Sequence, residues 1–210
     1  VMDTMLIQNI KENCKDILSI YKNTVKVKKR FGGGTNNFLW RGLGADRGEV
    51  VSSQIQGSDV TGNDITKFIR KIFDNILIKE YDCIATRSNS IMCSSYGIAN
   101  NYGGCPYVIF PVDGCSYTWF EKQESSYILF HIEESFEDII SNFNYESEYD
   151  YFFDDRYYEN MPKELQEQIK TAIENTTRSL KPSKTNLMDG IQLQNEFLIA
   201  GRKYYSIRYD

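Results

Sequence analysis

The chain has 210 residues, enough for one domain with a substantial hydrophobic core and too few for two full domains. Its formal net charge of −5 argues against a broad electrostatic attraction to nucleic acid, although a local basic groove is compatible with that total. No apolar run approaches the roughly 18 residues of a membrane-spanning helix. The first apolar positions are interrupted by Gln8, Asn9 and Lys11, which is not the pattern of a signal peptide. We therefore expect a globular protein without a membrane partner.

Cysteine and histidine usage narrows the chemistry further. An odd number of cysteines without CxxC pairs predicts free thiols in a reducing compartment and favours neither a disulfide framework nor a zinc site; they are Cys14, Cys83, Cys93, Cys105 and Cys115. We expect no metal. The single histidine, His131, lies in the stretch SYILFHIE, whose alternation predicts a strand, and any Ser-His or Cys-His mechanism would depend on it.

The N-terminal half of the chain predicts two amphipathic helices and one short strand. Residues 4–22 have apolar side chains at helical spacing after Asp3 or Thr4 as the N-cap. A run of three glycines at 32–34 predicts a flexible break, and NNFLWRG (36–42) predicts a short strand. Residues 64–79 form the clearest amphipathic helix, with one apolar face made of Ile65, Phe68, Ile69, Ile72, Phe73 and Ile76.

The C-terminal half predicts mainly strands, with two more helices. Strands are expected within residues 83–95, 106–114, 116–121 and 126–134, a short helix over 135–143, and an acidic, aromatic segment at 145–158 that wraps the surface. Pro162 opens a helix that extends to about Ser179, with Leu165, Ile169 and Ile173 inward. Residues 192–207 read as a strand, a break at Gly201 and a second strand. These elements predict a single α+β domain over residues 1–210, with residues 1–30 as an N-terminal helical segment.

The segment RGLGADRG (41–48) resembles the glycine-rich turn of dinucleotide-binding folds, but the elements around it do not fit. That turn needs a following helix whose N-terminal N–H groups hold pyrophosphate, whereas residues 49–53 show no helical period. A doubly wound fold is therefore disfavoured. Arg41 itself ends an apolar strand, where it is either a solvated strand end or a planar donor for phosphate or carboxylate.

Two further stretches carry candidate functional side chains. Cys93, Ser94 and Ser95 end a predicted strand, where the hydroxyl groups either cap the next segment or hold a distant carboxylate in one rotamer. Gln194 and Glu196 open a late strand, and the period of two places them on the same face. A glutamate beside a strand is commonly just exposed, so neither motif is specific by itself.

The order of the three motifs resembles the Arg-Ser-Glu arrangement of NAD-dependent ADP-ribosyltransferases. The matching residues are Trp40-Arg41-Gly42, then Cys93-Ser94-Ser95 with Ala99 and Tyr102, then Gln194-x-Glu196. The sequence RSNSIMCSS followed by YVIFPVDG is similar to transferase domains of tailed phages. Residues 57–63 resemble a segment that those domains carry between the first two motifs. The resemblance spans about residues 38–207, which would form the catalytic core. Cys93 departs from the pattern, because the family has serine there.

The resemblance implies a fold of two short, mainly antiparallel sheets that form an NAD cleft, flanked by helices. It implies that Glu196 stabilises the ribosyl cation, that Arg41 and Gly42 hold NAD, that Ser94 or Ser95 fixes the Glu196 rotamer, and that Tyr102 either lines the nicotinamide pocket or packs in the core. Gln194 and residues 183–193 would present the acceptor, and glutamine in place of glutamate disfavours arginine as that acceptor.

The implied activity is transfer of ADP-ribose from NAD to a host protein or nucleic acid, with NAD hydrolysis as a side activity. The implied location is the host cytoplasm, with delivery by a virion as one route. A different class of function fits the same fold: a catalytically silent phage or virion module that binds protein through its acidic, aromatic face. Both hypotheses leave the oligomeric state open.

Overall fold

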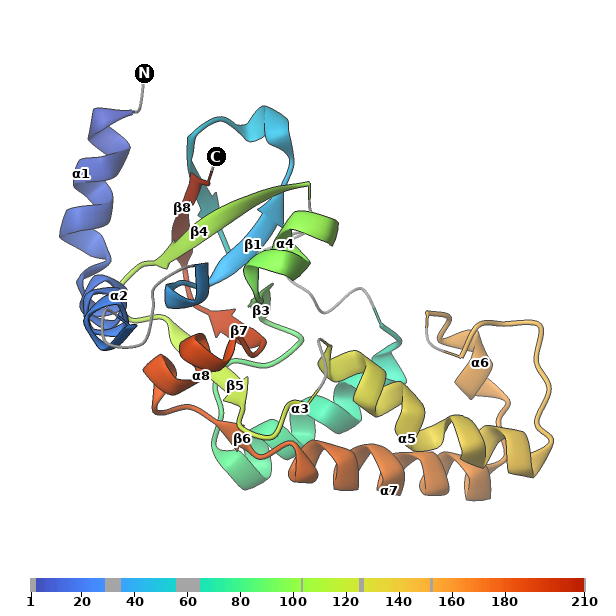
Figure 1. The fold of residues 1–210 in the computed structure, drawn as a ribbon. Coiled ribbons are helices and arrows are strands. Elements are labelled where there is room, and N and C mark those ends of the chain that lie inside the picture. The colour runs from blue at the N-terminus through green and yellow to red at the C-terminus, as the bar shows by residue number, and fades with distance from the viewer. Residues whose placement is uncertain are drawn as a thin grey trace.

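The computed structural model describes residues 3–28, 35–55, 65–102, 104–124, 127–151 and 153–209. The fold is α+β and consists of two four-stranded antiparallel sheets with helices on both sides (Figure 1). The first sheet lies in the upper part of the view and the second beneath it. A group of helices covers the lower face of the second sheet.

The first sheet has the strand order β1-β4-β8-β2, with β1 at Trp40–Leu43, β2 at Val50–Gln54, β4 at Cys105–Pro111 and β8 at Lys203–Arg208. All three pairings are antiparallel, and β8 pairs with β4 on one side and β2 on the other. Two short 3-10 turns, Thr35–Asn37 and Ala45–Arg47, lie before and after β1. The strand predicted for 36–42 thus begins later than expected, at Trp40, because residues 35–37 form a turn whose Thr35 carbonyl accepts the Trp40 indole N–H at 2.6 Å.

The second sheet has the order β3-β7-β5-β6, with β3 at Ser90–Cys93, β5 at Ser116–Phe120, β6 at Pro182–Ser183 and β7 at Phe197–Ala200. Its strand β7 is buried along its whole length. Phe197 and Ile199 belong to one hydrophobic cluster, and Leu198 and Ala200 belong to the other. Because alternate side chains of a strand point to opposite faces, this sheet is the middle layer of three.

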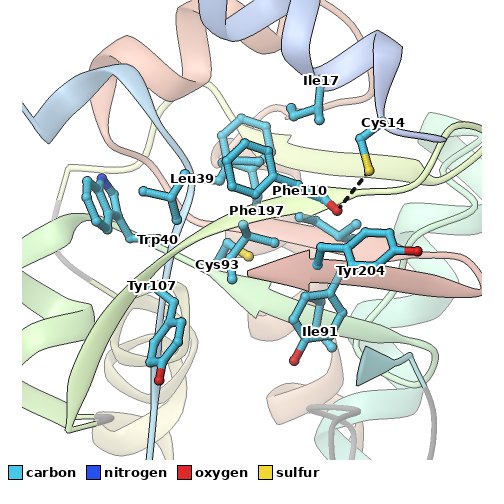
Figure 2. Close-up of a cluster of buried hydrophobic side chains, with 14 of the residues drawn as sticks. Cys14, Ile17, Leu39, Trp40, Ile91, Cys93, Tyr107, Phe110, Phe197 and Tyr204 are labelled. Carbon is cyan, nitrogen blue, oxygen red and sulfur yellow. Dashed lines mark hydrogen bonds between the residues drawn. The ribbon is translucent and has the colours of Figure 1, made fainter. Parts of the chain in front are cut away.

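The first hydrophobic cluster lies between the two sheets and beneath the N-terminal helices. Figure 2 shows Ile91, Cys93 and Phe197 from the second sheet among side chains of the first sheet and the N-terminal helices. The second cluster joins the other face of the second sheet to α3 (Lys67–Tyr81), α5 (Ile128–Phe143) and α7 (Lys163–Ser179). The smaller helices are α4 (Tyr96–Tyr102), α6 (Arg156–Glu159) and α8 (Leu187–Leu193).

The predicted helices at 64–79 and 162–179 are confirmed as α3 and α7. Helix α3 begins after Thr66, whose Oγ1 accepts the Ile69 N–H at 3.3 Å, and its predicted apolar face is buried or partly buried. Helix α7 begins directly after Pro162, and the three side chains predicted to point inward are fully buried. Helices α3 and α7 of the lower layer thus follow from sequence periodicity.

The single helix predicted for residues 4–22 is wrong, because the chain forms two helices that meet at Cys14. Helix α1 covers Thr4–Asn13, with Asp3 as the predicted N-cap, and α2 covers Lys15–Lys28. The turn after β4 interrupts them: the Asp113 N–H donates to the Asn13 carbonyl at 2.7 Å, and the Asp113 Oδ1 accepts the Asp16 N–H at 2.9 Å. Cys14 is buried there, and its Sγ donates to the Phe110 carbonyl (Figure 2).

The strand predicted for 126–134 is also wrong, since His131 lies in α5. The same apolar residues fit both periods, and Ile128, Ile132 and Phe136 are buried at helical spacing. The acidic segment 145–158 departs from its expected surface position at its end, where α6 buries Tyr157 and Tyr158.

Candidate functional site

The arginine and serine motifs meet where the two sheets touch. An isolated antiparallel bridge joins Trp40 of β1 to Ser94, which directly follows β3. The Ser94 N–H donates to the Trp40 carbonyl at 2.8 Å, and the Trp40 N–H donates to the Ser94 carbonyl at 3.3 Å. The half-buried Arg41 reaches the same strand, because its Nη1 donates to the Met92 carbonyl at 2.9 Å.

The glutamate motif lies on the other side of β3. Cys93 pairs with Phe197 at the end of the β3–β7 ladder, and Ser94 and Glu196 are the next residues of the two antiparallel chains. The structure therefore brings Arg41, Ser94 and Glu196 to one junction from β1, β3 and β7.

Glu196 is buried, with 3% of its surface exposed. Its Oε2 accepts the N–H of Ile128, the first residue of α5, at 3.1 Å. Its own N–H donates to the Gln123 Oε1 at 2.8 Å. The carboxylate thus lies at the N-terminus of a 16-residue helix, where it accepts a main-chain N–H that has no partner within the helix.

Gln194 does not share a strand face with Glu196, contrary to the prediction from the period of two. It ends α8 in the left-handed region, with φ 57°, and β7 begins only at Phe197. Its Nε2 donates to the Ile191 carbonyl at 2.7 Å, so the side chain turns back to its own helix. The strand prediction failed here because α8 extends to Leu193.

Ser95 acts as a helix cap, the first of its two alternatives. Its Oγ accepts the Ile98 N–H at 3.3 Å at the start of α4. Among the described contacts, neither Ser94 nor Ser95 donates its hydroxyl to Glu196. Cys93, which replaces the family's serine, is fully buried, and burial raises the pKa of its thiol to about 12, with Arg41 opposing that rise. The Cys93 side chain belongs to the first hydrophobic cluster, and no described hydrogen bond joins it to the Glu196 carboxylate.

The remaining predicted residues have different outcomes. Gly42 lies in β1 opposite Pro106 of β4, next to Arg41. Tyr102 is the last residue of α4, and its side chain lies outside the described residues, as does the whole of segment 57–63.

A hollow of about 530 Å³ lies beside α8 and the end of β5, and the predicted acceptor loop, residues 183–193, forms part of its lining. It is lined by Trp119, Glu121, Lys122, Asn186, Asp189, Gln192 and Leu193. The Nε2 of Gln192 is buried and has no hydrogen-bond partner among the described residues. The hollow therefore offers charges of both signs and a donor that a bound group can satisfy.

Sequence reasoning missed three contributors to this site: Gln123, Asn195 and the Ile128 N–H. Asn195 is buried and donates through Nδ2 to the Phe120 carbonyl at 2.8 Å. The available signal was the position of Asn195 inside the Gln-x-Glu motif. For Gln123 and Ile128 the signal was weaker, because it required the start of α5 to be known.

Comparison with known proteins adds no assignment: no protein-family model, curated protein or solved structure shows a significant match to this chain. Over the described residues, no group of three or more His, Cys, Asp or Glu side chains is arranged to hold a metal ion. In the same part of the chain, each helix is too short or too polar to cross a membrane.

Proposed function

We propose that this protein transfers ADP-ribose from NAD to a macromolecular acceptor and releases nicotinamide. The observation that supports the proposal is that the Trp40–Ser94 bridge and the Cys93–Phe197 pair bring together the three motifs of Arg41, Ser94 and Glu196, which are 53, 102 and 155 residues apart in the sequence. Most pairs of residues so far apart do not become neighbours, so their convergence supports a common role. The proposed location is the host cytoplasm, with delivery by a virion as one route.

Glu196 has the central role in the proposed reaction. The bond between nicotinamide and C1′ of the ribose breaks, its electron pair leaves with nicotinamide, and an oxocarbenium-like charge develops on the sugar. A buried, oriented carboxylate stabilises such a charge more strongly than one in water, because the surroundings have a low dielectric. An acceptor nucleophile then attacks C1′ and loses its proton. Water in place of the acceptor gives NAD hydrolysis.

Arg41 and Gly42 are proposed to hold NAD. A guanidinium is a planar set of N–H donors suited to pyrophosphate, and the contact to the Met92 carbonyl fixes the orientation of this one. Gly42 carries no side chain, which lets the nicotinamide carboxamide approach the main chain.

The proposed acceptor site is the hollow beside α8. Two of its lining residues, Gln192 and Leu193, directly precede the Gln194-x-Glu196 motif in the sequence. The Gln192 Nε2, which has no partner among the described residues, provides a hydrogen-bond donor for an acceptor group. Glutamine at position 194 disfavours arginine as the acceptor and leaves other side chains or nucleic-acid bases.

The proposal is tested by incubating the protein with labelled NAD and a host lysate. Nicotinamide release and a labelled macromolecule are expected, and Glu196→Gln should lower the rate about 10²–10³-fold because it removes the charge while preserving the shape. Glu134→Gln, at an exposed position of α5, is the matched control. Digestion with nuclease or protease then identifies the acceptor class. Absence of nicotinamide release from the parent contradicts the enzyme, and full activity of Glu196→Gln contradicts the site.

A catalytically silent binding module is the second candidate, and the charge distribution favours it. Residues 127–175 contain thirteen Asp and Glu against three Lys and Arg, a net charge of −10. Phe130 and Phe153 are exposed in the same segment. Such a surface suits a basic protein partner. This candidate predicts no turnover of NAD, so the same incubation separates the two.

A further inference from the structure

Helix α5 begins without a side-chain cap from its N-cap residue. The N-cap residue Tyr127 has extended dihedral angles, φ −137° and ψ 128°, and its side chain does not cap the helix. The N–H of Ile128 is instead satisfied by the Oε2 of Glu196, 68 residues later in the chain, at 3.1 Å. The carboxylate that the proposed reaction uses is therefore an anion bound at a helix N-terminus.

The main chain around Glu196 is fixed by the segment that leads into α5. The Asn195 side chain donates to the Phe120 carbonyl at 2.8 Å, and the Glu196 N–H donates to the Gln123 side chain at 2.8 Å. Together with the Ile128 contact, three hydrogen bonds join residues 195–196 to residues 120–128. We call this set of contacts the α5 clamp.

We propose that the α5 clamp, through the Ile128 N–H and Gln123, positions the Glu196 carboxylate for reaction. This inference rests on the proposed function and deepens it, because it replaces the serine hydroxyl that the family resemblance implied. The Ser95 hydroxyl caps α4, and no hydrogen bond described for this structure joins the Ser94 hydroxyl to Glu196. Gln123 and the Ile128 N–H act through Glu196 and are positioning groups.

Two physical effects make the clamp suitable for this role. An N–H donor to a buried carboxylate favours its ionised form, as does the positive end of the helix. The bond also restricts rotation of the side chain, so the charge is already oriented when the cation develops. Loss of the clamp should lower kcat and leave KM for NAD unchanged, because Arg41 and Gly42 are untouched.

The sharpest variant is Ile128→Pro, which removes the donor itself. Proline is well tolerated at the first position of a helix, and the extended dihedral angles of Tyr127 are those of a residue before proline. The control is Ile128→Ala, which retains the N–H but also loses the buried side chain. Gln123→Met, of similar shape but without the acceptor, tests the second contact independently of α5 folding.

The readouts are kcat, KM and the titration of the Glu196 carboxyl followed by ¹³C NMR. Relative to Ile128→Ala, Ile128→Pro should lower kcat about tenfold at constant KM, and its Glu196 should ionise at higher pH. The charged or titratable residues nearest in sequence to the clamp, Glu121, Lys122, Glu124 and His131, are present in both variants, so their influence cancels. Gln123→Met should also lower kcat at constant KM.

Failure of the clamp is distinguishable from failure of the proposed function. If Ile128→Pro and Ile128→Ala have the same kcat and the same Glu196 titration, the positioning role of the α5 clamp is contradicted but the proposed enzymatic function is not. If Ile128→Pro does not fold, an unchanged kcat in Gln123→Met contradicts the same role. A parent protein that does not turn over NAD contradicts the proposed function, and with it the catalytic role of the clamp.

Discussion

At the scale of single residues, the buried carboxylate of Asp74 determines the conformation of the turn before β3. Asp74 lies in α3 and accepts the N–H groups of Arg87 at 2.9 Å and Ser88 at 3.2 Å, together with the Ser88 hydroxyl. These bonds hold residues 87–88 in a turn, so the predicted strand 83–95 is reduced to Ser90–Cys93. The turn directs β3 towards the junction with Arg41 and Glu196.

Asp74 predicts a specific pH dependence of stability. Burial raises its pKa, and the hydrogen bonds from Ser88 and Arg87 oppose the rise only in part. The folded state then binds the proton more tightly than the unfolded state, so this group's stabilisation is present at low pH and is lost as pH rises from the ordinary carboxyl pKa through the raised one.

Asp74→Asn removes this titration. The stability difference, wild type minus variant, should therefore shrink as the pH rises through that window. Urea unfolding of both proteins between about pH 3.5 and 7 measures it. A difference that stays constant or grows with pH is the contrary result.

At the scale of elements, periodicity was sufficient where one face of a segment is apolar and its start signal is local. Helix α7 is the clearest case, since Pro162 marks its start and Leu165, Ile169 and Ile173 share one face. The closing strands around Gly201 were predictable from two apolar runs separated by a glycine, although the start of the first was not, because α8 extends to Leu193. Here a local pattern and the tertiary fold favour the same structure.

The failures occur where a distant part of the chain determines an element's boundary. Asp113 separates α1 from α2 at Cys14, and Glu196 caps the start of α5. No pattern within residues 4–22 or 126–134 contains this information. The candidate site shows the same difference. Its three motifs can be found in the sequence, but the α5 clamp depends on where α5 begins, and the local alternation of residues 126–134 predicts a strand there.

Two helical glycines, Gly190 of α8 and Gly97 of α4, predict opposite effects of substitution by alanine. A Cβ on Gly190 would lie 2.6 Å from Trp119 and 2.7 Å from Phe197, whose rings stack together. Gly190→Ala should therefore cost about 1–3 kcal/mol in the free energy of unfolding, through overpacking. A Cβ on Gly97, in α4, would meet no atom within 4 Å, and Gly97→Ala should stabilise by about 0.5–1 kcal/mol. Denaturant unfolding measures both, and equal effects would show that α8 packs differently.

At the scale of the whole molecule, charge is unevenly distributed along the chain, with a strongly acidic segment that forms α5, α6 and most of α7. Residues 127–175 carry −10 while the whole chain carries −5, so the remaining residues carry +5. The junction of Arg41, Ser94 and Glu196 belongs mostly to the positive remainder. The acidic segment would favour the approach of a basic partner.

Both sheets depend on the last two strands, which predicts the result of truncation. β8 is internal in the first sheet and β7 is internal in the second. A chain that ends after Glu196 should therefore lose slow hydrogen exchange across β1, β3, β4 and β5 together, and should unfold without a cooperative transition. The control is removal of residues 3–13, whose helix α1 is outside both sheets. Retained protection of β1 and β4 in the first truncation would contradict the topology.

The position of β7 and β8 also has a consequence for biosynthesis. Every strand pairing of β2, β3 and β8 includes a residue after position 196, so a ribosome must translate nearly all of residues 1–208 before either sheet can assemble. Folding of such long-range pairings is late by necessity. An enzyme that consumes NAD would then be inert as a nascent chain, and interrupted synthesis would release fragments that cannot modify the cell that makes them.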